Sequence, residues 1–408
     1  MVEVLEDNTK ENEEKHLDIH NVISTVRPII LFEYCCGIFR FSETDNKLSP
    51  PNGKMKAYSV VTCCIITSVT ILFLPLPGTL NDSSSFGDIM DKILYLLLLI
   101  QYLTNALITC FLHCRNNIRI FSMFAELDKT LNINSNKSFY ASFKARTVIY
   151  LIIICTVHII KTLYVFVTRE NTPLNMITSG LYFFQKLIIL IFCVMIMMLK
   201  RRLDIINDYI TRFVEENDNN KVFVYTVTQS RNIPNTTCNW IGRPSHKNMK
   251  IHDLALAYDH AGTICNLIND IFNFQMLMIL ITTFTCIVAT IWVLLHHYVF
   301  EGNSIGFIVI VALWTITLML NVIVMSFACE NLLSARKETK VLVNKVIMNY
   351  DLPKIMRNQA KAFMELIEAW PLSIMVYDMF AVDITMILKF ISVATTYLIV
   401  IIQISHFI

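Results

Sequence analysis

Residues 383–408 read DITMILKFISVATTYLIVIIQISHFI, which is long enough for one helix to cross a lipid bilayer. Helical spacing gathers a set of polar side chains on one face of this otherwise apolar segment, namely Lys389, Ser392, Thr396 and Gln403. Ile399 and Val400 lie between them along the same segment. A polar group in hydrocarbon costs free energy unless it meets a partner or water. The stripe is therefore expected either to hydrogen-bond to neighbouring helices or to face water.

The composition of the whole chain also indicates a membrane protein. It has 408 residues, of which 55% are hydrophobic and 16% charged, and its mean hydropathy is +0.54. The net charge of +2 gives no indication of a nucleic-acid partner. Seven apolar runs are each bounded by charged segments, at 57–76, 89–113, 147–167, 174–199, 275–298, 305–329 and 383–407. The sequence thus predicts an all-α membrane protein with seven transmembrane helices.

The distribution of basic residues predicts the orientation of these helices. The N-terminal segment and the even-numbered loops are rich in Lys and Arg, whereas the first, third and fifth loops contain only Lys92 and Arg169. Because basic segments stay in the cytoplasm, the N-terminus is expected inside and the C-terminus outside. Receptors that couple to G proteins have the opposite orientation. Asn81, in the acceptor pattern Asn-Asp-Ser, falls in an outer loop and is the candidate glycosylation site.

The polar segments between the apolar runs predict further divisions of the chain. The stretch 215–250 has no helical period and reads as a disordered linker, whereas the residues on either side of it continue the neighbouring helices. Breaks are expected near Leu352-Pro353 and Trp370-Pro371. In order, the predicted divisions are an N-terminal cytoplasmic arm and interfacial helix (1–56), transmembrane helices 1–4 (57–199), cytoplasmic extensions with the linker (200–274), helices 5–6 (275–329), a cytoplasmic helical segment (330–378) and the last helix (379–408). The cytoplasmic parts are expected to form a helical anchor domain.

Catalytic and metal-binding motifs give little support for an enzyme. The chain has no Walker loop, no G-x-S-x-G, no H-E-x-x-H and no pair of carboxylates inside a span. Cys110, His113 and Cys114 share one helical face and could ligate a metal, but thiols near a membrane interface more often serve packing. No cysteine lies in an outer loop, so a disulfide framework is not expected. We therefore expect no metal, no cofactor and no enzymatic activity.

The outer halves of the earlier spans offer aromatic surface with a few polar groups, as small-molecule sites require. The candidate pocket residues are Lys161, Tyr164, Tyr182, Gln185, Lys186, Trp292 and Trp314. Packing in the core or against lipid is the alternative role for each aromatic side chain. Lys161 and Lys186 lie at similar depths in the third and fourth spans. Amines without carboxylates favour a neutral or weakly acidic organic ligand over a cation.

The last segment resembles the end of insect gustatory receptors. Residues 396–404 resemble the T-Y, five apolar residues, Q-F signature that closes the last helix of that family, and residues 380–383 resemble the stretch that precedes it. The motif positions are Asp383, Thr396, Tyr397 and Gln403. Length, number of spans, inverted topology and short outer loops agree with the family over essentially the whole chain. Ile404 stands where the family usually has Phe, and Leu398 stands where sugar-sensing members have Glu, which favours a non-sugar type.

The resemblance implies a ligand-gated, nonselective cation channel in the plasma membrane of gustatory neurons. Its partners would be a small organic tastant, membrane lipids and other subunits, in a homo- or hetero-tetramer whose central pore is lined by the last helix of each subunit. Gln403 is then the candidate gate, with Ile399 or Val400 as a hydrophobic constriction, and Ser392 and Thr396 further along the pore. Lys389 would either face the pore or extend to the inner headgroups, and the second is favoured. An odorant receptor subunit that works with a co-receptor is the near alternative, and a polytopic transporter the distant one.

Overall fold

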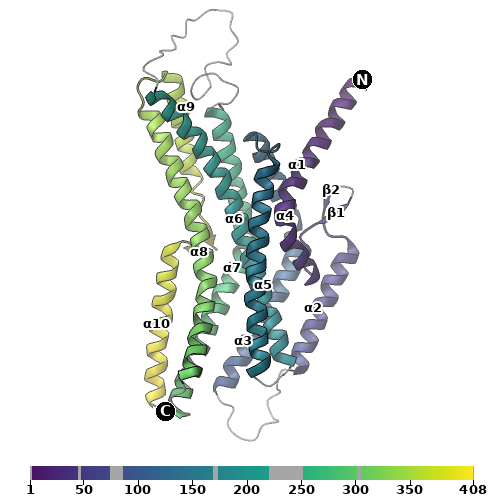
Figure 1. The fold of residues 1–408 in the computed structure, drawn as a ribbon, viewed down its shortest axis with the longest axis vertical. Helices are drawn as coiled ribbons and strands as arrows, with labels where there is room; N and C mark the ends of the chain where they lie inside the picture. The colour runs from purple at the N-terminus through teal and green to yellow at the C-terminus, as the bar shows by residue number, and fades with distance from the viewer. Residues whose placement is uncertain are drawn as a thin grey trace, which may run out of the picture.

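The computed structural model describes residues 2–44, 47–73, 86–168, 173–219, 251–300 and 305–407. Long, nearly parallel helices make up the fold (Figure 1). In chain order they are α1 (Val2–Cys35), α2 (Gly53–Phe73), α3 (Phe86–Leu107), a π-helical turn (Ile108–Leu112), α4 (Cys114–Thr130), α5 (Lys137–Thr168), α6 (Pro173–Asn219), α7 (Ile251–Phe300), α8 (Ile305–Met348), α9 (Lys354–Ala369) and α10 (Ile384–Phe407). Helix α9 lies between the two proline breaks that the sequence predicts.

The helices that can cross a membrane match the predicted apolar runs. Six described helical stretches are long and apolar enough, namely Gly53–Phe73, Lys92–Leu112, Lys137–Leu163, Met176–Arg212, Ile251–Leu294 and Val311–Met348. The seventh is α10, whose apolar stretch Ile384–Tyr397 belongs to a helix that continues to Phe407. The predicted all-α membrane fold with seven spans is therefore confirmed. Asn81 and most of the predicted linker lie outside the described residues.

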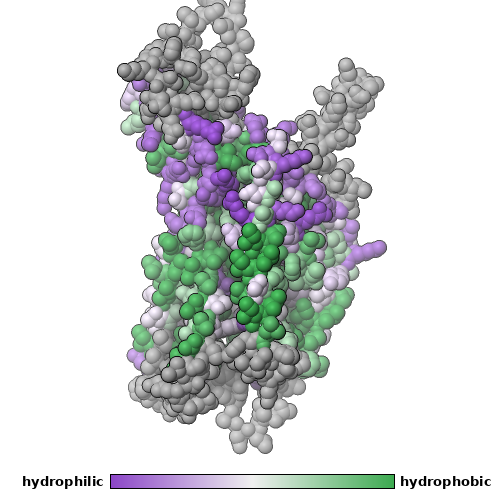
Figure 2. Space-filling view, viewed as in Figure 1, coloured by the Kyte–Doolittle hydropathy of each residue, from purple (hydrophilic) through white to green (hydrophobic). Residues whose placement is uncertain are grey.

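Three of the helices are much longer than a bilayer requires. Helices α6, α7 and α8 have 47, 50 and 44 residues, more than twice the roughly 20 residues that cross the hydrocarbon core. Figure 2 shows the consequence on this face: the lower half is mostly apolar, and a hydrophilic band covers the half above it. The same helices thus run from the apolar layer into a polar layer. The boundaries of the predicted anchor domain remain a prediction.

Helix α6 lies at the centre of the bundle. It contacts α1, α2, α3, α5, α7 and α8. In its most apolar 18-residue stretch, 83% of the residues are buried, compared with 17% in α2. Such a helix needs apolar residues all round, and the run LIILIFCVMIMML at 187–199 supplies them. Six of the other described helices therefore pack around α6.

Two short hairpins were not predicted from the sequence. Strand β1 (Ser42–Thr44) pairs with β2 (Lys47–Ser49), and β3 (Met375–Val376) pairs with β4 (Phe380–Ala381), both antiparallel. The second hairpin turns through Tyr377 and Asp378, whose φ angles are 49° and 55°, and the Met379 N–H donates to the Val376 carbonyl at 2.9 Å. Two successive left-handed residues are typical of a tight hairpin turn. This hairpin leads directly into α10.

The two ends of the described chain lie at opposite ends of the molecule, as an odd number of spans requires (Figure 1). The loop charges predict that the C-terminus is outside. An epitope placed after Ile408 should therefore be stained on intact cells, whereas one inserted within 215–250 should be stained only after permeabilisation. Staining of the C-terminal epitope only in permeabilised cells would contradict this orientation.

Candidate functional site

Three of the predicted pocket residues meet where α5, α6 and α8 pack together. The Lys161 Nζ lies 3.5 Å from the centroid of the Trp314 ring and 4.5 Å from that of the Tyr182 ring. The two rings are perpendicular, with centroids 5.4 Å apart. The Tyr182 hydroxyl lies 3.2 Å from Cys286 Sγ on α7, so a fourth helix borders the group. We call Lys161, Tyr182 and Trp314 the Lys161 cluster, in which an ammonium is held by cation–π contacts.

Polar side chains of α5 and α6 lie beside this cluster. The Thr162 and Ser179 hydroxyl oxygens are 2.8 Å apart, and His158 Nε2 is 3.4 Å from each of them. The His158 ring also packs on Phe183, with centroids 4.8 Å apart. The sequence analysis missed His158, although a lone histidine three residues before Lys161 on the same helix was a usable signal.

The other predicted pocket residues lie elsewhere or are only partly described. Gln185 is buried, and its Nε2 donates to Gln101 Oε1 of α3 at 3.5 Å, an oxygen that the Thr282 hydroxyl also approaches at 3.2 Å. It thus belongs to a polar contact among α3, α6 and α7. Lys186 is partly buried one turn after Tyr182, and Trp292 is partly buried on α7. The side chain of Tyr164 lies outside the described residues.

The motif residues at the start and middle of α10 have structural contacts. Asp383 caps the helix: its Oδ1 accepts from the Met386 N–H at 3.1 Å and from the Thr385 hydroxyl at 2.6 Å. Further along, the Tyr397 ring packs edge-on against Phe284 of α7, with centroids 5.3 Å apart. Phe390 contacts the same Phe284 ring at 6.1 Å. These contacts attach α10 to α7 and fix its rotation.

That rotation turns the polar stripe of α10 away from its own subunit. The side chains of the stripe are all exposed, namely Lys389, Ser392, Thr396, Ile399, Val400 and Gln403. Met386 is buried and Ala394 is partly buried, on the side facing the bundle. The stripe therefore does not hydrogen-bond to other described helices of the same chain. Of the two expectations from the sequence, hydrogen bonding to other helices is not met within the described part of the chain, and a pore-facing position of the stripe stays a prediction.

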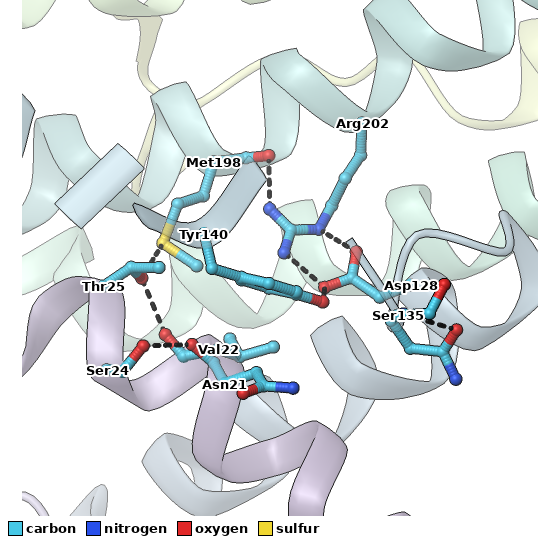
Figure 3. A network of polar contacts seen from close by, with 10 residues as sticks. Asn21, Val22, Ser24, Thr25, Asp128, Ser135, Tyr140, Met198 and Arg202 are labelled. Carbon is cyan, nitrogen blue, oxygen red and sulfur yellow. Dashed lines mark hydrogen bonds and ion pairs between the residues drawn. The ribbon is translucent and has the colours of Figure 1, made fainter. Parts of the chain in front are cut away.

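A buried ion pair joins α4, α5 and α6 in the polar half of the molecule (Figure 3). The Arg202 guanidinium donates from Nε to Asp128 Oδ1 and from NH2 to Oδ2, both at 2.7 Å. Oδ2 also accepts the Tyr140 hydroxyl at 2.7 Å, and Arg202 NH1 donates to the Met198 carbonyl at 2.9 Å. The side chains of Arg202 and Asp128 are 1% and 0% exposed, so the pair is fully desolvated. The sequence analysis counted Arg202 only as a basic loop residue and missed the pair.

A second buried ion pair holds the N-terminal segment. Arg40 donates to both carboxylate oxygens of Glu33 at 2.7 Å and to the Asn117 side-chain oxygen at 3.2 Å. Both charged side chains are 0% exposed, and the guanidinium lies 5.4 Å from the centre of the Phe272 ring. Nearby, burial raises the pKa of the Tyr34 hydroxyl, which donates to the Phe41 carbonyl at 2.8 Å. The charges of Glu33 and Arg40 thus neutralise each other inside the fold.

The segment between α9 and α10 is fixed along α7. Trp370 Nε1 donates to Asp259 Oδ1 at 2.8 Å, and the Trp370 carbonyl accepts from the Tyr258 hydroxyl at 3.0 Å. The indole lies directly on Gly262, where an added Cβ would be 2.5 Å from the ring. Two further α7 side chains hold the β3–β4 hairpin: Asn269 Oδ1 accepts from Met375 N–H at 3.1 Å, and Asn273 Oδ1 accepts from Tyr377 N–H at 2.7 Å.

Comparison with known proteins agrees with this architecture. The family model described as 7tm Chemosensory receptor matches residues 26–406. The insect olfactory receptor OR5 from Machilis hrabei has a similar fold, with a TM-score of 0.61 at 12% identity over 95% of this chain and 100% of that chain. Its complex with eugenol gives 0.60 at 13% identity, with the same coverage. A search of curated proteins finds no match. Since the family match spans nearly the whole chain, the protein belongs to the 7tm chemosensory receptor family, a family of receptors and not of enzymes.

Proposed function

We propose that this chain is a subunit of a gustatory receptor of the insect type, a ligand-gated and nonselective cation channel that opens when a small organic tastant binds. The observation that carries the proposal is the exposed polar stripe of α10, which faces away from the helices of its own subunit. The channel would be a homo- or hetero-tetramer in the plasma membrane of gustatory neurons. The last helix of each subunit would line its central pore.

A pore-lining position of the stripe is supported by the free-energy cost of exposing its polar groups to lipid. Facing lipid, Ser392, Thr396 and Gln403 would present polar groups to hydrocarbon. The Thr396 hydroxyl offsets part of this cost by donating to the Ser392 carbonyl at 2.9 Å, but the Gln403 amide needs partners outside its own helix. A rotational axis shared by four subunits would supply water and like amides. Gln403 near the outer end would then form the gate, with Ile399 and Val400 as an apolar constriction.

Lys389 is a charged residue on the same exposed face of α10. Four ammonium groups in a narrow pore would repel permeant cations. Lys389 is about 9 Å along the helix from Asp383, which begins α10. Its long side chain therefore reaches the inner headgroups, where the charge is hydrated.

The ligand would bind at the Lys161 cluster. This group combines aromatic faces with polar groups from α5 and α6, which is the composition of small-molecule sites. The similar OR5 structure was also solved with a small molecule, eugenol. The Tyr397 and Gln403 motif favours the gustatory type, whereas the likeness to OR5 favours an odorant receptor subunit. Expression of the chain alone in oocytes, with a panel of plant compounds, tests this: a ligand-evoked current from the chain alone would favour the gustatory type, because an odorant subunit would need its co-receptor to conduct.

Shortening Gln403 tests the proposed gate. Gln403→Ala removes the amides that would close the pore, so it should raise the ligand-independent current several-fold or change ion selectivity, with little effect on apparent ligand affinity. Ile391→Ala is the control, because Ile391 is also exposed on α10 but lies about 120° around the helix. Equal leak in both variants, or an unchanged current in Gln403→Ala, would place the pore elsewhere.

A further inference from the structure

The central parts of the membrane-spanning helices contain basic side chains but no acidic ones. No Asp or Glu occurs in 57–73, 92–113, 137–168, 173–199, 271–300, 305–329 or 384–408. Lys161 and Lys186 lie within two of these ranges, and neither forms an ion pair with any described residue. An intramembrane ammonium without a counter-charge costs several kcal/mol. The two lysines therefore mark a place where a negative charge from outside the chain would be stabilised.

The contacts of Lys161 show how the chain holds this charge without an acid. Its ammonium lies over the Trp314 and Tyr182 rings, 3.5 Å and 4.5 Å from their centroids. A cation–π contact contributes about 2 kcal/mol when desolvated, which offsets only part of the cost of burial. The Lys161 ammonium thus already occupies the position above these rings where an organic cation would bind. A cationic ligand would meet both a blocked aromatic face and a like charge.

The surrounding groups suit an aromatic anion. Tyr182 and Lys186 are one turn apart on α6, so both can face the same ligand. Thr162, Ser179 and His158 add hydroxyl and imidazole groups on the neighbouring turn of α5 and at the start of α6. Phe183 packs on His158 and adds apolar surface for a ring. Hydrogen-bond donors and aromatic faces are present together. The carboxylate of an aromatic acid would accept hydrogen bonds from the donors, while the ring of the acid packs on the aromatic faces.

We infer that the ligand of this site is an organic acid, with an aromatic or other apolar body, whose carboxylate pairs with the Lys161 ammonium and is assisted by Lys186. The inference rests on the proposed function, since it names the class of compound that the receptor detects. Lys161 then has two roles: it occupies the aromatic faces in the absence of ligand, and it becomes the counter-ion when ligand is bound.

Three compounds with the same ring and chain length test the inference: 3-phenylpropionate, 3-phenylpropionamide and 3-phenylpropylamine, which are anionic, neutral and cationic. Their binding to the purified full-length receptor in nanodiscs is measured by titration. The acid should bind at least about tenfold more tightly than the amide, and the amine most weakly. Lys161→Met should remove the preference for the acid, and Lys161→Arg should retain most of it. Lys144→Met, an exposed lysine on the same helix, should leave the preference intact.

The result of the titration is independent of the variants, since it compares three compounds on the unaltered receptor. The inference is overturned if the acid does not bind more tightly than the amide. This includes the case in which none of the three compounds binds. Channel activity is recorded separately in oocytes. If only neutral compounds evoke currents, the result would support the proposed channel and contradict the acid site. Tight binding of the acid by a chain that conducts neither alone nor with other gustatory receptor subunits would support the acid site and contradict the proposed channel.

Discussion

Asp128→Asn should be among the most destabilising single substitutions in this receptor, lowering the free energy of unfolding by about 3–5 kcal/mol. The change keeps the size of the side chain but removes the charge that pairs with Arg202, and both residues are almost completely buried. The guanidinium would then remain desolvated with no counter-charge, and the Tyr140 hydroxyl would lose a charged acceptor. The expected result is a marked loss of surface expression and a lower unfolding temperature of the solubilised receptor.

Two controls separate this effect from a general loss of charge. Asp204→Asn removes the partner of Lys200, whose side chain is 38% exposed, and should cost no more than about 1 kcal/mol. Combining Asp128→Leu with Arg202→Met replaces the whole pair by apolar side chains and should recover much of the lost stability. An Asp128→Asn receptor that unfolds at the unaltered temperature would show that the pair is not closed in the folded protein.

Gly262→Ala should also destabilise the receptor strongly, because the added methyl group would clash with Trp370. The added methyl group would lie 2.5 Å from atoms of the Trp370 indole. This ring cannot move without loss, because its Nε1 donates to Asp259 and its residue's carbonyl accepts from Tyr258. We expect a cost of about 1–3 kcal/mol from overpacking, with further loss from the broken hydrogen bonds. The destabilisation should appear as reduced surface expression. Ligand-evoked current should also fall, because Trp370 precedes the hairpin that leads into α10.

Gly180→Ala is the matched control, because nothing lies within 4 Å of the Cβ that it adds to α6. Alanine favours helix over glycine by up to about 1 kcal/mol, so this variant should express as well as the unaltered receptor. Adding Trp370→Leu to Gly262→Ala should relieve the collision and restore part of the expression. Normal expression and currents in Gly262→Ala alone would contradict the close packing of the indole.

The sequence predicted those features that depend on neighbouring residues. Each span follows from a continuous apolar run, and the predicted start of the last span at Asp383 is one residue from the observed start of α10. Helical periodicity alone also groups Gln403 and Thr396 on one face, whereas the sequence left open whether that face meets other helices or water. Such features need no knowledge of how distant segments meet.

Features that depend on tertiary contact were missed. Asp128 and Arg202 are 74 residues apart, and nothing in either local sequence indicates that they pair. The contact of the Gln185 amide with Gln101 was also missed, because the rotation of α6 is set by packing on every side; the place of Gln185 in a ligand pocket stays a prediction. The β3–β4 turn has Tyr377 and Asp378 at positive φ, without the Asn-Gly pair that usually marks such a turn. Here the tertiary fold overrides local preference.

The continuity of α6 makes it a mechanical link between the two ends of the molecule. Tyr182, in the Lys161 cluster, and Arg202, in the buried ion pair, belong to one helix with no Gly or Pro between them. The 20 residues that separate them form a stiff rod about 30 Å long, so a tilt of about 5° at one end moves the other by roughly 2–3 Å. Arg202 lies near the middle of the 47-residue helix and is held on α4 and α5, so it can serve as a fulcrum. A push on Tyr182 would then swing the part of α6 beyond Arg202 in the opposite direction.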